Sequence, residues 1–294
     1  MTKISGIFAA SMSVLNSDLS LNIEKTIVHA EKLIDQGCHG TAIFGSTGQA
    51  QLISISEKIK LLNNLSESKY RDKHLIGTGL NSLNETINFM KIANSLSFKK
   101  FLVMPPAYYK YEDKDVLNFY TKLVQAVPDC QIILYNFEKL CGYKFSVECV
   151  EEIVKRFPNQ IVGVKDSSYN LFEKLKLENF SLMPGSESKL LKGLELGCTG
   201  IITATCNVTA QLARRVYEDF FSGKKQMYNE KLINVRNAFE KYNLISALHT
   251  LLVREDKIYR NLLPPLRLLN EVDETNLIKS LKDLNFKTKS QLAA

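Results

Sequence analysis

Eight short β-type runs alternate with longer segments of helical period in this chain, and no other feature constrains its fold as strongly. The intervening segments carry apolar residues three and four positions apart, as in Ile23, Ile27, Ala30, Leu33 and Ile34. Eight strands that are each followed by a helix predict an α/β fold, the (β/α)8 TIM barrel, which needs about 250 residues. The predicted strands are Ile4–Ala10, Thr41–Phe44, His74–Thr78, Lys100–Met104, Gln131–Leu134, Ile161–Lys165, Ser181–Pro184 and Gly200–Thr203.

A doubly wound open sheet is the alternative fold. It is disfavoured because no G-x-G-x-x-G motif follows the first strand, and because the strands number eight. We therefore expect a barrel over residues 1–223, closed by a helix over Thr209–Ser222. Residues 224–294 are helical in pattern, are interrupted at Pro264-Pro265 and exceed what closing a barrel requires. They predict a C-terminal helical extension.

Composition and charge exclude several classes of partner. The net charge of +7 is spread along the 294 residues, without the clustered basic face that a nucleic-acid site needs. No apolar stretch approaches the ~20 residues of a membrane span, and the first residues do not resemble a signal peptide. The six cysteines form no C-x-x-C and lie at no metal-ligand spacing from a histidine. We therefore expect a soluble cytoplasmic protein that binds no metal, nucleic acid or membrane.

A lysine lies at the end of the sixth predicted strand, where the sequence reads Ile161-Val162-Gly163-Val164-Lys165. Such a strand is buried on both faces, and an ammonium group is rarely buried because its desolvation is costly. A desolvated lysine loses its proton more easily and can attack a carbonyl to form a Schiff base. The alternative is that Lys165 reaches solvent beyond the strand, or pairs with Asp166.

Polar residues follow the other strands at the same end, where such barrels carry their catalytic groups. The segment after the second strand, Gly45–Gln49, offers hydroxyl and backbone N–H groups that can bind a carboxylate ligand. A tyrosine near an imine-forming lysine can act as a general acid and base, although any one tyrosine is more often a core or interface aromatic. The segments are Gly45–Gln49, Tyr108–Tyr109, Tyr135–Asn136, Gly185–Glu187 and Thr203–Thr205.

These motifs together resemble the pyruvate-dependent class I aldolases and lyases. That family (the DapA family) includes dihydrodipicolinate synthase, N-acetylneuraminate lyase and the 2-keto-3-deoxy-sugar aldolases. The resemblance covers the chain from about Ile7 to Val208. It rests on GSTGQ at 45–49, YYK at 108–110, YN at 135–136, GVKD at 163–166, GSE at 185–187 and GIITATCNV at 200–208.

The resemblance implies a role for each catalytic residue. Lys165 would form the imine with pyruvate or another 2-keto acid, so that no separate cofactor is needed. Tyr135 would move protons at the reacting centre, and Ser46 would link it into a proton relay. Tyr109 resembles the tyrosine that family members insert into a neighbouring subunit's site. The family's usual assembly implies a homotetramer built from dimers.

The resemblance also implies the residues that bind substrate. Thr47 and Gly48, together with Ser46, would hold the carboxylate of pyruvate, a small-molecule partner. Gly185 and Ile202 would shape the floor around the imine. The identity of the aldehyde would depend on loops that include Ser167 and Glu187.

Two departures from the family pattern separate the alternatives. Dihydrodipicolinate synthases carry an arginine where this chain has Leu140, and a proline where it has Glu138. A leucine cannot bind a second carboxylate, so lysine biosynthesis is disfavoured. The sialic-acid lyases carry an Asp-Glu pair where this chain retains only Glu187.

We expect an aldolase or lyase for a 2-keto-3-deoxy acid. The alternatives are 4-hydroxy-tetrahydrodipicolinate synthase, a 2-keto-3-deoxy acid dehydratase, and a ligand-binding or regulatory module.

Overall fold

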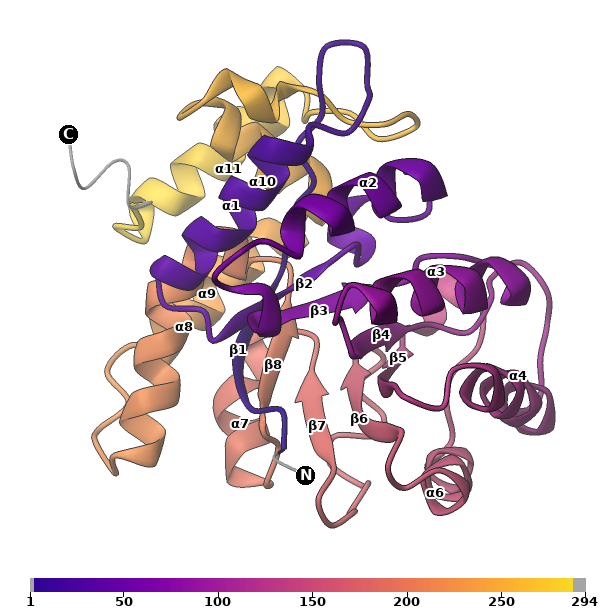
Figure 1. The fold of residues 1–294 in the computed structure, drawn as a ribbon. Helices are drawn as coiled ribbons and strands as arrows, with labels where there is room; N and C mark the ends of the chain where they lie inside the picture. The colour runs from indigo at the N-terminus through magenta and orange to yellow at the C-terminus, as the bar shows by residue number, and fades with distance from the viewer. Residues whose placement is uncertain (1–2, 288–294) are drawn as a thin grey trace.

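A computed structural model describes residues 3–287 of the chain. Eight parallel strands form a barrel and helices surround it (Figure 1). The strands lie in the order β7-β6-β5-β4-β3-β2-β1-β8. Their bounds are β1 Gly6–Ala10, β2 Gly40–Ile43, β3 His74–Gly77, β4 Lys100–Val103, β5 Gln131–Asn136, β6 Ile161–Asp166, β7 Ser181–Pro184 and β8 Gly200–Thr203. The predicted TIM barrel is confirmed, and β5 and β6 continue two residues and one residue further than the sequence indicated.

The two ends of the sheet meet between β7 and β8. The N–H of Thr199, directly before β8, donates to the carbonyl of Leu182 in β7 over 3.0 Å, so the barrel is nearly closed. On its other side β8 approaches β1 very closely, because Gly200 has a φ of +151° and a Cβ there would lie 1.9 Å from the Gly6 carbonyl oxygen. Only glycine fits this position.

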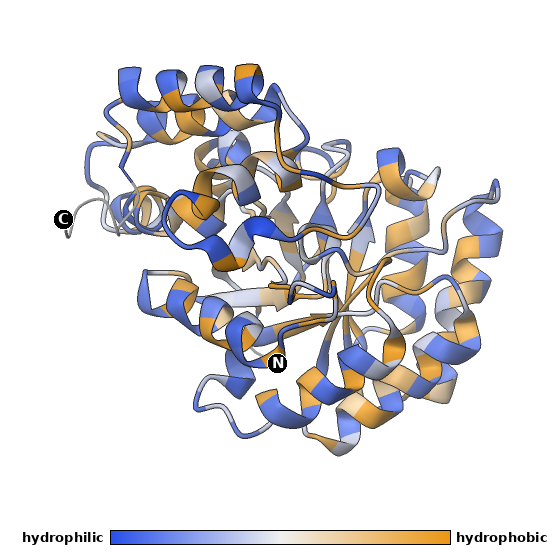
Figure 2. Cartoon of the chain, turned by 90° about the horizontal axis from the view of Figure 1, so that it is seen from above, coloured by the Kyte–Doolittle hydropathy of each residue, from blue (hydrophilic) through white to orange (hydrophobic). Residues whose placement is uncertain are grey.

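Helices follow most strands and cover the barrel from outside. Several of them begin with a side-chain cap; for example, Ser54 and Glu57 form a reciprocal capping box at the start of α2. Figure 2 shows hydrophobic and hydrophilic residues on each helix, as in amphipathic helices around a core. The helices of the barrel are α1 Ile23–Asp35, α2 Ile55–Leu65, α3 Leu83–Ser95, α4 Asp113–Ala126, α5 Glu138–Cys141, α6 Val147–Arg156, α7 Leu190–Glu195 and α8 Cys206–Phe221.

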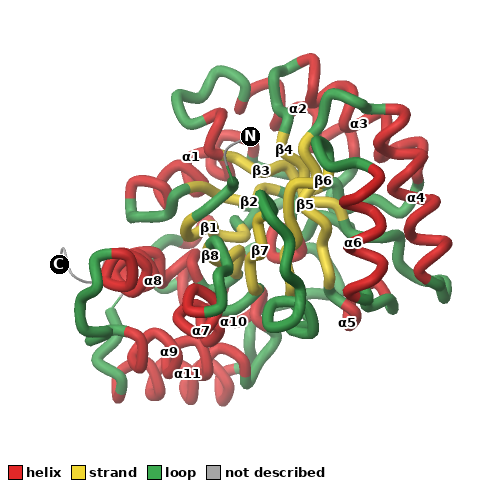
Figure 3. Tube along the Cα trace, turned by 90° about the horizontal axis from the view of Figure 1, so that it is seen from below, coloured by secondary structure: helices red, strands yellow, loops and turns green. Residues whose placement is uncertain are grey.

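Up to residue 287, three further helices follow the barrel: α9 Asn229–Glu240, α10 Leu244–Val253 and α11 Glu271–Asp283. Figure 3 shows them gathered on one side of the strands, next to α7 and α8. They share a buried apolar cluster with Met12 and Val14, which follow β1, so this helical part packs on the carboxyl end of the barrel. The division at residue 223 stays a prediction. Residues 1–2 and 288–294, which the two predicted parts include, lie outside the described residues.

Candidate active site

Lys165 is the penultimate residue of β6, and only 4% of its surface is exposed. Strand β5 pairs with β6 so that Tyr135 lies in register with Lys165. The Lys165 Nζ atom lies 4.2 Å from the centre of the Tyr135 ring. Among residues 3–287 the Lys165 Nζ atom has no hydrogen bond and no ion pair. The alternatives in which Lys165 reaches solvent or pairs with Asp166 therefore do not describe this structure.

Asp166 points away from Lys165 because successive side chains of a strand face opposite sides. Its buried carboxylate accepts hydrogen bonds from the backbone N–H groups of Tyr169, Leu171 and Phe172 and from the Asn136 side chain. Burial raises the pKa of Asp166, and these hydrogen bonds oppose that rise. Asp166 thus fixes the loop that follows Lys165.

The loop after β2 forms a single 3₁₀ turn, Ser46–Gly48, held between two strained residues. Phe44 and Gln49 have φ values of 57° and 56°, in the left-handed region that residues other than glycine rarely adopt. The turn places the Ser46 hydroxyl 3.2 Å from that of Tyr135, and the backbone N–H groups of Ser46 and Thr47 have no acceptor among the described residues. The turn thus offers two free donors, and its Ser46 hydroxyl contacts the tyrosine that lies next to Lys165.

The loop after β7 approaches the residue that follows the active-site strand. Gly185 donates its N–H to the Asp166 carbonyl over 2.9 Å, and a Cβ at Gly185 would lie 2.2 Å from the Ser167 Oγ. Glycine therefore allows this close contact without displacing Ser167. Ile202 is fully buried in β8. Gly185 and Ser167 lie together at the carboxyl end of the barrel, and Ser167 is two residues from Lys165 in the chain.

Glu187 occupies a different environment from the one that the sequence suggested. Its carboxylate is fully buried and accepts hydrogen bonds from Thr203 Oγ1 at 2.7 Å and Thr209 Oγ1 at 3.1 Å. Its Oε2 also lies 3.3 Å from Nη1 of Arg236. Three donors fill most of the acceptor capacity of this carboxylate, so we do not propose Glu187 as a binding group for substrate hydroxyls.

Arg236 was not predicted as a site residue. It lies on α9, outside the barrel, and only 4% of its surface is exposed. Its Nη1 also lies 3.1 Å from Thr203 Oγ1 and 3.2 Å from Thr205 Oγ1, and its Nε donates to Glu240 over 2.7 Å. In the sequence, an arginine on a helix is ordinarily a surface residue, so no local pattern could have identified it.

Tyr109 lies on an exposed loop after β4, with 69% of its surface accessible, and Tyr108 beside it is 89% exposed. The two rings meet edge to face with centroids 5.1 Å apart. Tyr108 has a φ of 91°, a strained conformation that directs the loop outward. The Tyr109 ring therefore does not fold back onto its own barrel.

A sequence model described as the dihydrodipicolinate synthetase family matches residues 3–284. The chain belongs to that family. It is 25% identical over 287 residues to a DapA-like lyase of Halobacterium salinarum, covering 95% of this chain and 93% of that protein. It is 27% identical over 235 residues to the 4-hydroxy-tetrahydrodipicolinate synthase of Methanopyrus kandleri, covering 78% of each.

Among solved structures, a variant of the 2-keto-3-deoxygluconate aldolase of Sulfolobus solfataricus has the same fold. It superposes with a TM-score of 0.84 at 20% identity, covering 95% of this chain and 96% of that one. As a member of the dihydrodipicolinate synthetase family, the chain is a lyase of the pyruvate-dependent aldolase type. The family and activity predicted from the sequence are confirmed at this level.

The loop in which the chain departs from the synthase pattern forms α5. Leu140 is 44% exposed there, and Glu138 pairs with Lys144 at 3.2 Å. The Glu138 N–H donates to the Ser168 Oγ over 2.9 Å, which joins this turn to the loop after Lys165. Leu140 thus presents an apolar side chain where a synthase of this family would present a guanidinium group.

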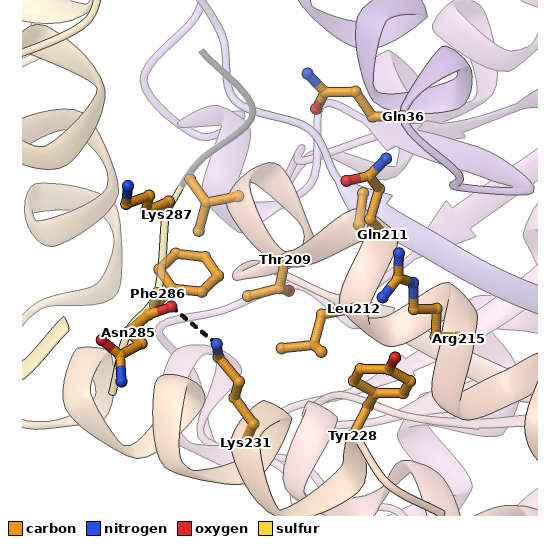
Figure 4. Close-up of a pocket in the computed structure, with 12 residues that line it drawn as sticks. Gln36, Thr209, Gln211, Leu212, Arg215, Tyr228, Lys231, Asn285, Phe286 and Lys287 are labelled. Carbon is orange, nitrogen blue, oxygen red and sulfur yellow. Dashed lines mark hydrogen bonds between the residues drawn. The ribbon is translucent and has the colours of Figure 1, made fainter. Parts of the chain in front are cut away.

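A separate cavity of about 260 Å³ lies between α8, α9 and the chain that follows α11 (Figure 4). It contains none of the predicted site residues. Lys231, which lines it, donates to the Asn285 carbonyl over 2.8 Å. Within residues 3–287 no cluster of three His, Cys, Asp or Glu side chains could hold a metal ion. In the same range no helix is long and apolar enough to cross a membrane.

Proposed function

We propose that the chain makes or breaks a carbon–carbon bond between pyruvate and an aldehyde through an imine on Lys165. The observation that carries this proposal is a buried, unpaired lysine beside a tyrosine whose hydroxyl contacts Ser46. An amine without an ion-pair partner is available to attack a carbonyl, and the adjacent phenol can supply and recover the protons.

The reaction needs no metal because the imine itself accepts electrons. In the cleavage direction, the Lys165 amine attacks C2 of a 4-hydroxy-2-keto acid, and the carbinolamine loses water to give the imine. Removal of the C4 hydroxyl proton breaks the C3–C4 bond and releases the aldehyde. The electrons of the C3–C4 bond move to the imine, which becomes an enamine. Protonation at C3 and hydrolysis then release pyruvate and restore the amine. Tyr135 is proposed to move these protons.

The Ser46–Gly48 turn is proposed to bind the carboxylate of pyruvate. The free N–H groups of Ser46 and Thr47 are suitable donors for an anion, and Gly48 allows the turn to pack tightly, because a Cβ there would lie 2.9 Å from the Ser11 carbonyl. The Ser13 hydroxyl donates to the Gly48 carbonyl over 2.7 Å and supports the turn. Gly185 and Ile202 are proposed to shape the floor around the imine.

A 2-keto-3-deoxy acid is the proposed substrate class. The exposed apolar Leu140 argues against a second carboxylate on the aldehyde, although relatives such as the Methanopyrus kandleri protein are named as 4-hydroxy-tetrahydrodipicolinate synthases. The aldolase of Sulfolobus solfataricus acts on 2-keto-3-deoxygluconate, according to its name. A dehydratase would use the same lysine and is the second candidate.

The exposed Tyr109 supports a dimer in which each subunit completes the other's site, and we propose a tetramer built from two such dimers. A cytoplasmic location is also proposed, because all six cysteines are buried and unpaired, as is usual in a reducing compartment.

A screen of 2-keto-3-deoxy acids for pyruvate release tests the function, with borohydride present in a parallel set of reactions. Release of pyruvate together with covalent trapping is expected for an aldolase. Trapping with loss of water and without pyruvate release would instead identify a dehydratase. No trapping with any 2-keto acid would overturn the proposal.

A further inference from the structure

A buried ionic cluster joins the helices after the barrel to the end that carries Lys165. Arg236 of α9 is its centre, since its Nη1 contacts Glu187, Thr203 and Thr205 within 3.3 Å. Its Nε donates to Glu240, whose side chain is 42% exposed to solvent. Burial would lower the pKa of Arg236, but the two glutamates raise it, so the guanidinium remains charged.

The residues that Arg236 contacts come from separate loops at the carboxyl end of the barrel. Glu187 follows β7 two residues after Gly185, Thr203 is the last residue of β8, and Thr205 lies just before α8. Gly185 in turn contacts Ser167, which is two residues from Lys165. One guanidinium group therefore connects α9 to both loops on the β7–β8 side of the imine position.

The loop after β6 reaches the same cluster through Tyr169. Burial raises the pKa of Tyr169. The charge of Arg236 and the interaction of the Tyr169 hydroxyl with Ser186 lower this pKa, and the charge of Glu187 raises it. Tyr169 has a φ of 58°, which is strained for an aromatic residue. Strained residues of this kind persist where the surrounding contacts fix the conformation, and they concentrate at functional sites.

We propose that Arg236 is a positioning residue that determines substrate specificity. It holds the loops after β7 and β8 as the pocket wall that contacts the distal carbons of a long 2-keto acid. This inference rests on the proposed function. A short substrate does not extend to this wall, so only longer substrates depend on Arg236. Glu187 helps to hold this wall in place and does not contact substrate, because its carboxylate binds Arg236.

The test compares two substrates in Arg236→Lys, Arg236→Gln and wild-type protein. The substrates are six-carbon 2-keto-3-deoxygluconate and five-carbon 4-hydroxy-2-ketopentanoate, whose cleavage gives pyruvate with glyceraldehyde or acetaldehyde. The kcat/KM for the six-carbon substrate should fall about 10- to 100-fold, as expected when positioning contacts are lost. The value for the five-carbon substrate, and the rate of pyruvate trapping by borohydride, should stay within about threefold of wild type.

Arg254→Gln is the matched control, since it removes an exposed ion pair to Glu274 at 2.9 Å between α10 and α11. It should leave both substrates unaffected. If both Arg236 variants fail to fold, Thr205→Val and Glu240→Gln, which each remove one partner of Arg236, should lower only the six-carbon kcat/KM.

Several results separate this inference from the proposed function. Equal losses for both substrates, or unchanged kinetics with a lowered melting temperature, would show that Arg236 acts only in folding. Wild-type cleavage of the five-carbon substrate alone would also overturn the inference. Absence of pyruvate trapping in wild-type protein would instead remove the proposed function.

Discussion

The Nζ atom of Lys165 lies 4.2 Å from the centre of the Tyr135 ring. The parallel pairing of β5 and β6 produces this contact, because it sets the two residues in register. The Tyr135 hydroxyl then lies 3.2 Å from the Ser46 Oγ, and its ring stacks on Phe137 with centroids 6.0 Å apart. Strands β5 and β6 and the turn after β2 therefore bring the Lys165 amine, the Tyr135 phenol and the Ser46 hydroxyl together.

Lys165 is expected to be the residue that forms the imine. Pyruvate and borohydride should add one reduced pyruvoyl unit to the chain, and peptide mapping should place it on Lys165. Lys165→Arg should abolish the label although it keeps the charge, because a guanidinium group stays protonated and is a poor nucleophile. Mass spectrometry of the intact protein and of its peptides checks both results.

Lys58 is the natural competitor for this label. It is fully buried, burial lowers its pKa to about 8, and its Nζ donates to the Thr78 carbonyl over 2.8 Å. That hydrogen bond holds the amine against the backbone after β3. Lys58→Arg should therefore retain the label, and a label on Lys58 in wild-type protein would contradict the assignment.

Tyr135→Phe should slow turnover by about 10²–10⁴, the usual contribution of a general acid or base. The fold should be preserved, because the change removes only a hydroxyl group whose partner is Ser46. Tyr120→Phe is the control, since it removes a buried hydroxyl that donates to the Val103 carbonyl over 2.8 Å. This control should lose about 1 kcal/mol of stability and keep its kcat. Near-wild-type single-turnover rates in Tyr135→Phe would assign the proton transfer elsewhere.

Condensation of pyruvate with aspartate semialdehyde should be negligible. Leu140 offers no charge for the second carboxylate, and Glu138 beside it is paired with Lys144. A coupled assay with a dedicated synthase as reference measures the rate. Activity comparable to that reference would mean that another cation, such as the exposed Lys139, binds the carboxylate.

The free energy of unfolding should decrease between pH 6.5 and pH 4. Burial is the largest cause that lowers the pKa of each of the four histidines, His29, His39, His74 and His249, to about 4. Their unfolded pKa is about 6.5, so the unfolded chain binds more protons in this range. The stabilisation is complete above pH 6.5 and is lost as the pH falls towards 4, at up to about 1.4 kcal/mol per pH unit for each of His29, His74 and His249 and less for the partly exposed His39.

Urea unfolding at pH 7, 6 and 5 measures this dependence. The raised pKa of Asp166 acts with the opposite sign, but it is one group against four. His74→Asn should lose the share of a single histidine. A free energy of unfolding that is constant from pH 7 to pH 5 would contradict the prediction.

The sequence predicted the barrel well because its strands are short apolar runs whose ends carry chemically distinctive residues. Lys165, Tyr135 and Ser46 each lie at or just beyond the end of a predicted strand. The register of β5 and β6 aligns Tyr135 with Lys165, and the turn after β2 brings Ser46 to Tyr135. Glu187 and Arg236 could not be placed in this way. Their pairing joins residues 49 positions apart, from a barrel loop and a later helix, and depends on how α9 packs. No periodicity or local motif indicates that Glu187 and Arg236 are close in space, and the substrate role expected for Glu187 came from the family resemblance.

Tyr109 is expected to complete the active site of a neighbouring subunit. Its ring is 69% exposed on a strained loop that begins with Pro105-Pro106, and an exposed aromatic on a stiff loop is better explained by a partner surface than by solvent. In a two-fold dimer the same contact is made in both directions, so each site would receive one tyrosine. Tyr109→Phe should then lower kcat while leaving Lys165 labelled by pyruvate and borohydride.

Mixed dimers test whether Tyr109 acts in the site of the neighbouring subunit or in the site of its own subunit. Lys165→Ala subunits, which are expected to be inactive, and Tyr109→Phe subunits, which are expected to have a low kcat, are co-expressed with different tags and the mixed dimer is purified. If Tyr109 acts across the interface, one pocket combines the intact Lys165 of one subunit with the intact Tyr109 of the other. That dimer should regain about half of the wild-type activity per dimer, because one of its two sites is complete. If Tyr109 acts within its own subunit, every pocket lacks one of the two groups, and mixing restores nothing although the dimer forms.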